Sequence, residues 1–411
     1  MDITLHFNPT HSNAFVVNLP LSKSQSNRAL IINYLSKKSV SFKAISEAKD
    51  TSILSNILNQ LPEVVDVGPS GTSFRFLVAL LCVTPGQRII TGTERLRQRP
   101  IGPLVSALCA IGGQIKYLDR IGFAPLAIEG QQSLEGGSLE LDSSQSSQFA
   151  SALLMIGPVC KNGLDLSFSN IPASQDFIEL TLKMMDDAGA KVLRQGQRII
   201  VESGNYGPGH LVIEKDWASA SYFYALVALS NSNIEIFFPE LLPDSNQPDR
   251  RTVELFEMLG IETIPASLGI LIRRKTKKLP EFFSYDFSNC PDLVMSVAVV
   301  LAALNIPAEL IGLHTLSLKE SDRTKVLAAE LSKFGKQVVN TNSSSLLISG
   351  IFSCRANVKI QTYLDHRIAM AFAPLVVLTN SITIEDPDVV EKSFPSFWKE
   401  MSIFAELIYN A

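Results

Sequence analysis

Cationic and hydroxyl side chains gather at the expected starts of several apolar helices. Lys23, Ser24 and Arg28 open the first helix, and Arg367 lies at the start of the last. A helix N-terminus presents free backbone N–H groups and a partial positive charge, and both attract anions. The pattern therefore predicts a site for heavily phosphorylated small molecules. Six such helices are expected, with starts near Lys23, Gly71, Ser146, Asp216, Pro291 and Asp365.

The first of these starts combines two cations with a hydroxyl group. We expect Ser24 to cap the helix, while Lys23 and Arg28, about one turn apart, face the same anion. The alternative is a capped surface helix with a solvated arginine.

A glycine turn and an arginine before a proline add to this pattern. Gly71, which opens a helix, would let the backbone approach a ligand closely. Arg99 precedes Pro100, which favours an extended backbone at Arg99. Each feature alone is also typical of an ordinary turn or a surface arginine.

Short hydrogen-bonding side chains fill the stretch from Ser143 to Gln148, directly before an apolar helix. Hydroxyl and carboxamide groups suit a sugar-like phosphate. The same groups are also typical of redundant helix capping.

Acidic side chains stand among cations in the segment Lys319-Glu320-Ser321-Asp322-Arg323. A carboxyl group wedged among cations can donate or accept a proton beside an anionic substrate. The alternative is a surface capping cluster with local ion pairs. A single lysine near the end of the chain, Lys392, would ordinarily be expected in solvent.

Composition limits the class of protein. The chain has 411 residues, 46% of them hydrophobic and 18% charged, with a net charge of −4. These values fit a globular protein of two domains and argue against a nucleic-acid binder. The longest apolar stretch, 293–304, is too short to span a bilayer, and the first residues do not resemble a signal peptide. We therefore expect a cytoplasmic protein.

Cofactor and metal motifs are missing from the sequence. It contains no phosphate-binding P-loop, no dinucleotide glycine motif and no His-Glu-x-x-His metal motif. The cysteines number five and are widely spaced, so we expect reduced, mostly buried thiols.

A repeat of about 70–75 residues organises the chain. Strand-like runs begin near Ile89, Leu164, Ile234, Ala308 and Ile382, and the amphipathic helices that follow the first four end at glycines. The unit reads strand, helix, strand, strand, apolar helix. About six copies fit, three per domain, with the first copy shortened around 40–67. The alternative is chance alternation in a generic α/β protein.

Nine stretches, taken in order along nearly the whole chain, resemble the EPSP synthase (3-phosphoshikimate 1-carboxyvinyltransferase) family of enolpyruvyl transferases. They are LPLSKSQSNRAL, GPSGTSFRFL, RQRPIGPLVSAL, SSQSSQFASALLM, ASASYF, CPDLVMSVA, LKESDRTKVLAAEL, LDHRIAMAF and KSFPSFW.

The resemblance implies a fold and an activity. The fold would be a two-domain, inside-out α/β barrel of six βαβαββ repeats, with lobes at 20–216 and at 1–19 plus 217–411 and the active site in the cleft. The enzyme would transfer the enolpyruvyl group of phosphoenolpyruvate to the 5-hydroxyl of shikimate 3-phosphate and release phosphate. No metal or organic cofactor would be needed. These two substrates would be its partners, without nucleic acid or membrane, and the chain would be a monomer.

The resemblance also assigns roles. Asp292 would accept the hydroxyl proton, Glu320 would protonate the methylene carbon and later remove a proton, and Lys23 would assist phosphate departure. The residues implied to bind shikimate 3-phosphate are Lys23, Ser24, Arg28, Ser146, Ser147, Gln148, Ser174, Asp292 and Lys319. Those implied to bind phosphoenolpyruvate are Lys23, Gly71, Arg99, Gln148, Arg323, Arg367 and Lys392.

Four positions depart from the family pattern: Leu21, Pro69 and Phe76 replace the usual glycine, asparagine and proline, and Phe177 replaces a tyrosine that would hydrogen-bond the shikimate group. Two rival interpretations stay open. One is the sister enzyme that acts on UDP-N-acetylglucosamine, although Cys109 falls in an expected helix rather than in a reactive loop. The other is a non-catalytic clamp that only binds anions.

Overall fold

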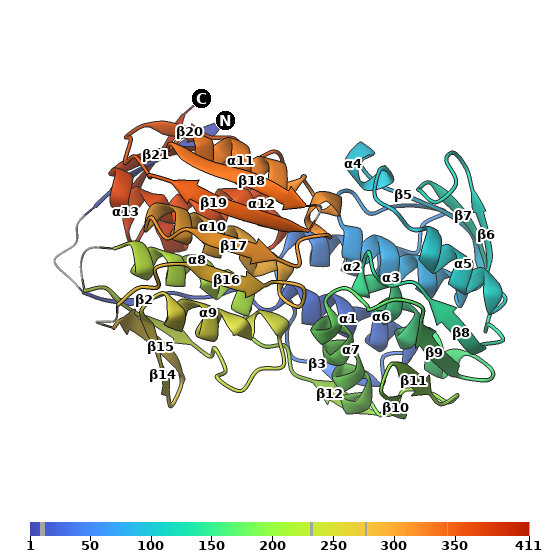
Figure 1. The fold of residues 1–411 in the computed structure, drawn as a ribbon. Helices are drawn as coiled ribbons and strands as arrows, with labels where there is room; N and C mark the ends of the chain where they lie inside the picture. The colour runs from blue at the N-terminus through green and yellow to red at the C-terminus, as the bar shows by residue number, and fades with distance from the viewer. Residues whose placement is uncertain (9–12, 231–232, 276–277, 343, 411) are drawn as a thin grey trace. The chain divides into compact units, whose positions relative to one another are not determined.

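Six β-sheets organise the part of the chain that the structure, a computed structural model, describes: residues 1–8, 13–230, 233–275, 278–342 and 344–410 (Figure 1). Five of these sheets have four strands and one has two. The two-stranded sheet contains β3 (Val40–Phe42), in the stretch where the sequence predicted a shortened copy. The predicted α/β fold with six repeats is confirmed.

The chain divides into two compact units, Met1–Leu21 with Glu214–Ala411, and Ser22–Ile213. Each unit holds three of the sheets. The first unit contains β20 (Val358–Ile360), β21 (Ser381–Glu385), β1 (Asp2–Phe7) and β22 (Ala405–Asn410); β14 (Ile261–Ala266), β15 (Gly269–Arg274), β13 (Glu235–Pro239) and β2 (Ala14–Val16); and β16 (Phe283–Asp286), β17 (Ala308–Ile311), β19 (Ser345–Gly350) and β18 (Lys336–Asn342). The second contains β4 (Val64–Asp66), β5 (Gly86–Thr91), β7 (Leu126–Gly130) and β6 (Gln114–Tyr117); β10 (Val192–Gln195), β11 (Arg198–Val201), β9 (Leu164–Phe168) and β8 (Gly137–Leu141); and β12 (Gly209–Leu211) with β3.

Most sheets repeat one topology. A parallel pair of strands is joined through a buried helix, and antiparallel strands extend the sheet, as parallel pairs require a crossover connection. In the second unit, β4 and β5 are joined through α3 (Gly71–Cys82), and β8 and β9 through α6 (Ser147–Ile156). In the first unit, α10 (Val294–Ala303) joins β16 to β17, and α12 (His366–Phe372) lies between β20 and β21.

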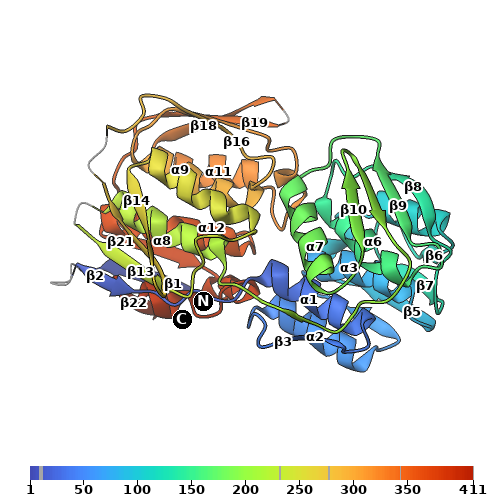
Figure 2. The same cartoon turned by 90° about the horizontal axis from the view of Figure 1, so that it is seen from below.

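Two repeats exchange a strand. The helix α1 (Lys23–Leu35) follows β2 and leads to β3, and α8 (Trp217–Leu229) follows β12 and leads to β13. However, β2 pairs in parallel with β13, and β12 pairs in parallel with β3. The strand before α1 therefore pairs with the strand after α8, and the strand before α8 pairs with the strand after α1. The first strand, β1, pairs with β21 and β22 of the C-terminal part, as Figure 2 shows.

The helices inside each unit are apolar on every side. All residues of α8, α10 and α12 are buried in the core of the first unit, and nearly all of α3 and α6 in that of the second. A helix with no polar face is stable only inside a core. Their polar residues lie mostly in the N-terminal half of each helix. The remaining helices are α2 (Lys49–Gln60), α4 (Glu94–Arg97), α5 (Gly102–Ala110), α7 (Gln175–Asp187), α9 (Thr252–Met258), α11 (Arg323–Ser332), α13 (Val376–Thr379) and α14 (Phe397–Met401).

The cap of the first helix differs from the expectation. Ser22, rather than Ser24, is the N-cap of α1, and its Oγ accepts from the Gln25 N–H at 3.4 Å. Two serines two residues apart are equally good caps in sequence, and only the backbone decides between them. The predicted glycine ends of the amphipathic helices are confirmed by positive φ angles at Gly112, Gly189, Gly260 and Gly335.

The described cysteines are all free thiols. Cys82, Cys160 and Cys290 are buried, whereas Cys109 and Cys354 are exposed. Cys109 lies in α5, as expected. Among the described residues, no helix is both long and apolar enough to cross a membrane.

Candidate active site

Asp292 lies at the centre of a cluster of cations in the first unit. It belongs to a short 3-10 helix, Pro291–Leu293, directly before α10. Its Oδ1 accepts from Arg323 Nη1 at 3.1 Å and lies 3.7 Å from Lys319 Nζ. Its Oδ2 accepts from Arg367 Nη2 at 2.7 Å. Lys319, Arg323 and Arg367, which the sequence analysis placed in the same site as Asp292, thus surround its carboxylate.

These cations decide the protonation of Asp292. Burial alone would raise the pKa of its carboxyl group, but Arg367, Lys319 and Arg323 hold that pKa well below its usual range. In turn, the carboxylates around Arg323 raise the pKa of its guanidinium group, although burial acts in the opposite direction. Asp292 is therefore an anion at neutral pH in this state of the protein.

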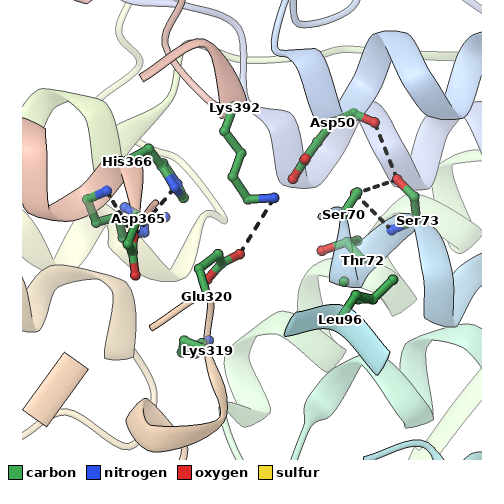
Figure 3. Close-up of polar contacts among 12 residues, drawn as sticks. Asp50, Ser70, Thr72, Ser73, Leu96, Lys319, Glu320, Asp365, His366 and Lys392 are labelled. Carbon is green, nitrogen blue, oxygen red and sulfur yellow. Dashed lines mark hydrogen bonds and ion pairs between the residues drawn. The ribbon is translucent and has the colours of Figure 1, made fainter. Parts of the chain in front are cut away.

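Glu320 shares two of the predicted cations. Its Oε2 accepts from Arg323 Nη2 at 3.2 Å, and its Oε1 lies 3.8 Å from Lys392 Nζ (Figure 3). Lys392 was expected in solvent from its position near the chain end alone, yet its side chain is buried. A long hydrophobic stem with a charged tip can be buried when a carboxylate lies at the tip.

Asp365 anchors this cluster, and the sequence marked it only as a helix start. It is the N-cap of α12 and accepts from the Arg367 N–H at 3.0 Å. Its carboxylate also accepts from Arg323 and from Ser321 Oγ, each at or below 3.3 Å. Tyr222 supports the same arginine pair, since its hydroxyl oxygen accepts from Arg367 Nη1 at 3.0 Å. Tyr222 lies in the stretch ASASYF, but the sequence alone assigned it no role.

A further acid near the cluster, Asp249, was also missed. It is buried, and its Oδ1 has no hydrogen-bond partner among the described residues. Burial and the nearby charge of Asp292 raise the pKa of Asp249 to about 8. A protonated carboxyl group at this position avoids a second buried anion. It lies in a short 3-10 helix, Pro248–Arg251, away from any motif, and this place hid it in the sequence.

Lys23 meets a buried acid in the second unit. Its Nζ donates to Asp50 Oδ2 at 3.1 Å, and Asp50 is almost wholly buried. The carbonyl group of Asp50 also accepts from Ser73 Oγ at 3.3 Å, and Ser73 bonds the helix cap Ser70 (Figure 3). Asp50 therefore ties the start of α1 to the start of α3.

Arg28 is buried rather than solvated. Its guanidinium group donates to Thr181 Oγ1 at 2.7 Å and to the Ser24 carbonyl at 2.9 Å. The rings of Phe76 and Phe177 lie 5.3 Å and 5.9 Å from its Cζ. Burial lowers the pKa of Arg28 to about 9, so it is still cationic at neutral pH. This fixed cation surrounded by hydroxyl groups is suited to bind an anion.

Gly71 is required by the side chain next to it. A Cβ at Gly71 would lie 2.3 Å from Arg99 Nη1, so only glycine leaves the guanidinium group where it is. Gln148 is held nearby: its Oε1 accepts from Arg75 Nη1 at 2.8 Å, and its Nε2 donates to Thr72 Oγ1 at 2.9 Å. The structure thus brings together α3, the segment before α5 and the start of α6.

The three predicted serines have distinct places. Ser146 is the N-cap of α6, where its Oγ accepts from the Gln148 N–H at 3.2 Å, and Ser147 is buried beside it. Ser174 precedes α7 with φ of +52° and makes no capping bond. A serine in the left-handed region is rare in proteins overall, and residues in such strained conformations cluster at binding sites.

The predicted residues therefore fall into two groups, one in each unit. The first unit holds Asp292, Lys319, Glu320, Arg323, Arg367 and Lys392 in one connected cluster; the second holds Lys23, Ser24, Arg28, Gly71, Arg99, Ser146, Ser147, Gln148 and Ser174 at the starts of its helices. Among the described residues, no group of three or more His, Cys, Asp or Glu side chains is arranged to hold a metal ion.

Comparison with known proteins gives consistent matches. Residues 60–401 match the model of the family described as EPSP synthase (3-phosphoshikimate 1-carboxyvinyltransferase). A protein of Bacteroides fragilis (strain YCH46), named 3-phosphoshikimate 1-carboxyvinyltransferase, is 42% identical over 94% of each chain. The fold is similar to an EPSP synthase structure from Acinetobacter baumannii, with a TM-score of 0.76 at 20% identity over all of both chains. It is also similar to the enolpyruvyl transferase NikO from Streptomyces tendae, with a TM-score of 0.74 at 11% identity over 100% of this chain and 98% of that one.

Proposed function

The chain belongs to the EPSP synthase family, and we propose that residues of both units carry out its enolpyruvyl transfer. The reaction joins the 5-hydroxyl oxygen of shikimate 3-phosphate to C2 of phosphoenolpyruvate and releases phosphate. It is a transferase reaction of the shikimate pathway, which leads to chorismate and the aromatic amino acids. The observation that carries the proposal is the cluster in which Arg323 and Arg367 both bond Asp292, with Glu320 beside them.

Phosphoenolpyruvate is a compact trianion at most, and it needs fixed cations. Arg323 and Arg367 are buried and held in place by carboxylates, so they lose little freedom when they bind an anion. Lys392 is linked to this pair by Glu320, whose carboxylate lies near Lys392 Nζ and also accepts from Arg323. In the second unit, we assign Lys23, Gly71, Arg99 and Gln148 to the same substrate.

Shikimate 3-phosphate has hydroxyl groups as well as a phosphate and a carboxylate. Arg28 supplies a fixed cation, and hydroxyl and carboxamide groups supply directional hydrogen bonds. We assign this substrate to Lys23, Ser24, Arg28, Ser146, Ser147, Gln148, Ser174, Asp292 and Lys319. Phe177 has no hydroxyl group to bond the shikimate ring, so the hydrogen bond that a tyrosine would make at this position is absent.

Two carboxyl groups divide the proton transfers. As the 5-hydroxyl oxygen attacks C2, Asp292 accepts the hydroxyl proton and Glu320 gives a proton to C3. In the second step the Glu320 carboxylate removes a proton from C3, the C2–O bond to phosphate breaks, and Lys23 stabilises the leaving phosphate. Fixed charges aimed at the reacting atoms lower the barrier without reorganising during the reaction.

The low pKa of Asp292 makes it a weak base while the cations face it alone. Substrate anions share Arg323, Arg367 and Lys319, and this sharing raises the basicity of Asp292 when it is needed. Substrate binding and activation of the base are thereby linked.

We further propose that the enzyme acts as a cytoplasmic monomer, with lobes at 20–216 and 1–19 plus 217–411, and that it needs no cofactor, nucleic acid or membrane. Size-exclusion chromatography with light scattering would test the monomer, with a mass of 45.0 kDa expected for one chain.

Phosphate release by the purified protein tests the reaction. We expect release with phosphoenolpyruvate and shikimate 3-phosphate, and none with UDP-N-acetylglucosamine as the acceptor. Glu320→Gln should lower kcat at least 100-fold, in the range of general acid–base catalysis. Release only with UDP-N-acetylglucosamine would assign the sister activity. Tight binding of both substrates without any release would assign a non-catalytic clamp.

A further inference from the structure

A tight turn lies directly before α12, the helix that carries Arg367. The Asp365 N–H donates to the Thr362 carbonyl at 2.9 Å, which closes a turn of four residues. Its central residues, Tyr363 and Leu364, have φ of +52° and +56°. Positive φ at both central positions is the mark of a type I′ turn, which favours Asn and Gly. Two bulky residues are therefore held in a conformation that they disfavour.

Burial of the turn does little to offset this strain. Leu364 is 73% exposed, so its side chain gains little from leaving water. Tyr363 is also exposed in part, but its hydroxyl group donates to Glu330 Oε1 at 3.0 Å. A hydrogen bond to a charged acceptor is stronger than a neutral one. The bond to Glu330 therefore ties the strained turn to α11.

Glu330 is built to serve as an anchor. It is fully buried in the last turns of α11. Its Oε2 accepts from the Gln361 N–H at 3.2 Å and pairs with Lys333 Nζ at 2.5 Å. Lys333 also donates to the Lys359 carbonyl at 2.8 Å. The charge of the Glu330 carboxylate is therefore balanced by Lys333. One carboxylate oxygen bonds Gln361, just before the turn, and the other bonds Tyr363 in the turn.

The helix α11 holds this segment at two points. At its start Arg323 bonds Asp365, and near its end Glu330 bonds Tyr363. Both α11 and α12 lie in the orange-to-red, C-terminal part of the chain (Figure 1). Because the turn runs directly into α12, its backbone geometry sets the direction in which the Arg367 side chain points from the first turn of that helix.

We propose that the hydrogen bond from Tyr363 to Glu330 is a positioning contact for phosphoenolpyruvate binding, because it holds the strained turn that aims Arg367. The inference rests on the proposed function, in which Arg367 binds that substrate. Tyr363 and Glu330 touch no reacting atom in this proposal. They act only through the turn.

Tyr363→Phe removes the hydroxyl group and keeps the ring. We expect the KM for phosphoenolpyruvate to rise about tenfold, the size of one lost hydrogen bond to a charged group. The KM for shikimate 3-phosphate should change less than twofold. The matched control is Tyr285→Phe, because Tyr285 also donates to a glutamate, Glu254, in the same unit, and neither residue is assigned to a substrate. A merely structural role would lower stability without separating the two KM values.

A second variant tests the strain directly. Leu364→Gly relieves the left-handed conformation at the second central position, where type I′ turns favour glycine. The double variant Tyr363→Phe/Leu364→Gly should therefore recover part of the lost affinity for phosphoenolpyruvate. No recovery, or a Tyr363→Phe variant that behaves like Tyr285→Phe, would overturn the proposal.

Arg367→Lys separates this inference from the proposed function. If Arg367→Lys leaves the KM for phosphoenolpyruvate unchanged, the assignment of Arg367 is wrong and the inference falls with it. If Arg367→Lys raises that KM and Tyr363→Phe does not, only the positioning role is wrong. The expected result is a rise with both variants.

Discussion

Asp365 accepts two hydrogen bonds from Arg323, from Nε at 2.9 Å and from Nη2 at 3.3 Å, and both side chains are buried. The same carboxylate caps the helix that carries Arg367. One acid therefore fixes Arg323 and Arg367, the two arginines of the first unit that we assign to phosphoenolpyruvate. We regard Asp365 as a positioning group, because it bonds Arg323 and the Arg367 N–H and is not itself assigned to a substrate.

Asp365→Ala should lower the free energy of unfolding by about 3 kcal/mol, because it leaves a buried arginine with part of its charge uncompensated. Asp365→Asn keeps an acceptor oxygen and should lower it by less. Urea unfolding of both variants measures this difference. A loss below about 1 kcal/mol for the alanine variant would show that Asp292 and Glu320 hold Arg323 without Asp365.

Asp50→Asn tests the support of Lys23. The variant keeps the size of the side chain but removes the charge that faces Lys23 Nζ at 3.1 Å. We expect kcat to fall roughly tenfold or more, since a misplaced catalytic group loses much of its effect. The control is Glu135→Gln, which breaks the exposed pair with Lys161 and should leave kcat unchanged. Equal kcat values for the two variants would remove Asp50 from the site.

Gly71→Ala tests the close approach to Arg99. The added Cβ would lie 2.3 Å from Arg99 Nη1 and 2.7 Å from its Cζ, so the guanidinium group must move. Because that group is the end of a flexible side chain, the free energy of unfolding should change by less than about 1 kcal/mol. The KM for phosphoenolpyruvate should rise about tenfold, as expected for loss of one charged contact.

Gly102→Ala is the matched control, since Gly102 also opens a helix and its added Cβ would meet only Gly122 Cα, at 3.6 Å. It should leave both KM values unchanged. If Gly71→Ala also leaves them unchanged, the position of Arg99 does not matter for binding.

The order of elements could be predicted from the sequence because strands, glycine caps and apolar helices recur with one period. The repeat alone does not give the pairing of β2 with β13 or of β12 with β3, because the partners are far apart in the chain. Only the family resemblance, which places 1–19 with the C-terminal lobe, implied that the chain crosses between lobes. A short polar loop before each helix carries no information about which sheet its strand joins.

The candidate site was predictable where it lies at helix starts and hidden elsewhere. Lys23, Arg323 and Arg367 stand in mixed polar motifs, whereas Asp50 lies in an ordinary amphipathic helix. Burial of Arg28 was equally hidden, because α1 buries a continuous run of polar and apolar residues, 25–32, and therefore has no periodic pattern that marks an inner face.

Asp249 should make stability depend on pH. Its pKa is raised to about 8 by burial and by Asp292, above the value of about 3.9 in an unfolded chain. The folded protein therefore binds this proton more tightly between those values. The stabilising contribution of the protonated group is complete below about pH 4 and is lost as the pH rises to about 8. A neutral, non-titrating side chain should avoid this loss.

Asp249→Asn should accordingly gain stability relative to the unchanged protein as the pH rises from 5 to 8, by about 1 kcal/mol per pH unit. Urea unfolding at pH 5, 6.5 and 8 measures the gain. Asp286→Asn, which replaces an exposed carboxyl group of the same unit, is the control and should show a constant difference over this range. A constant difference for Asp249→Asn as well would mean that Asp249 is ionised throughout, and that the cations around Asp292 neutralise two buried carboxylates rather than one.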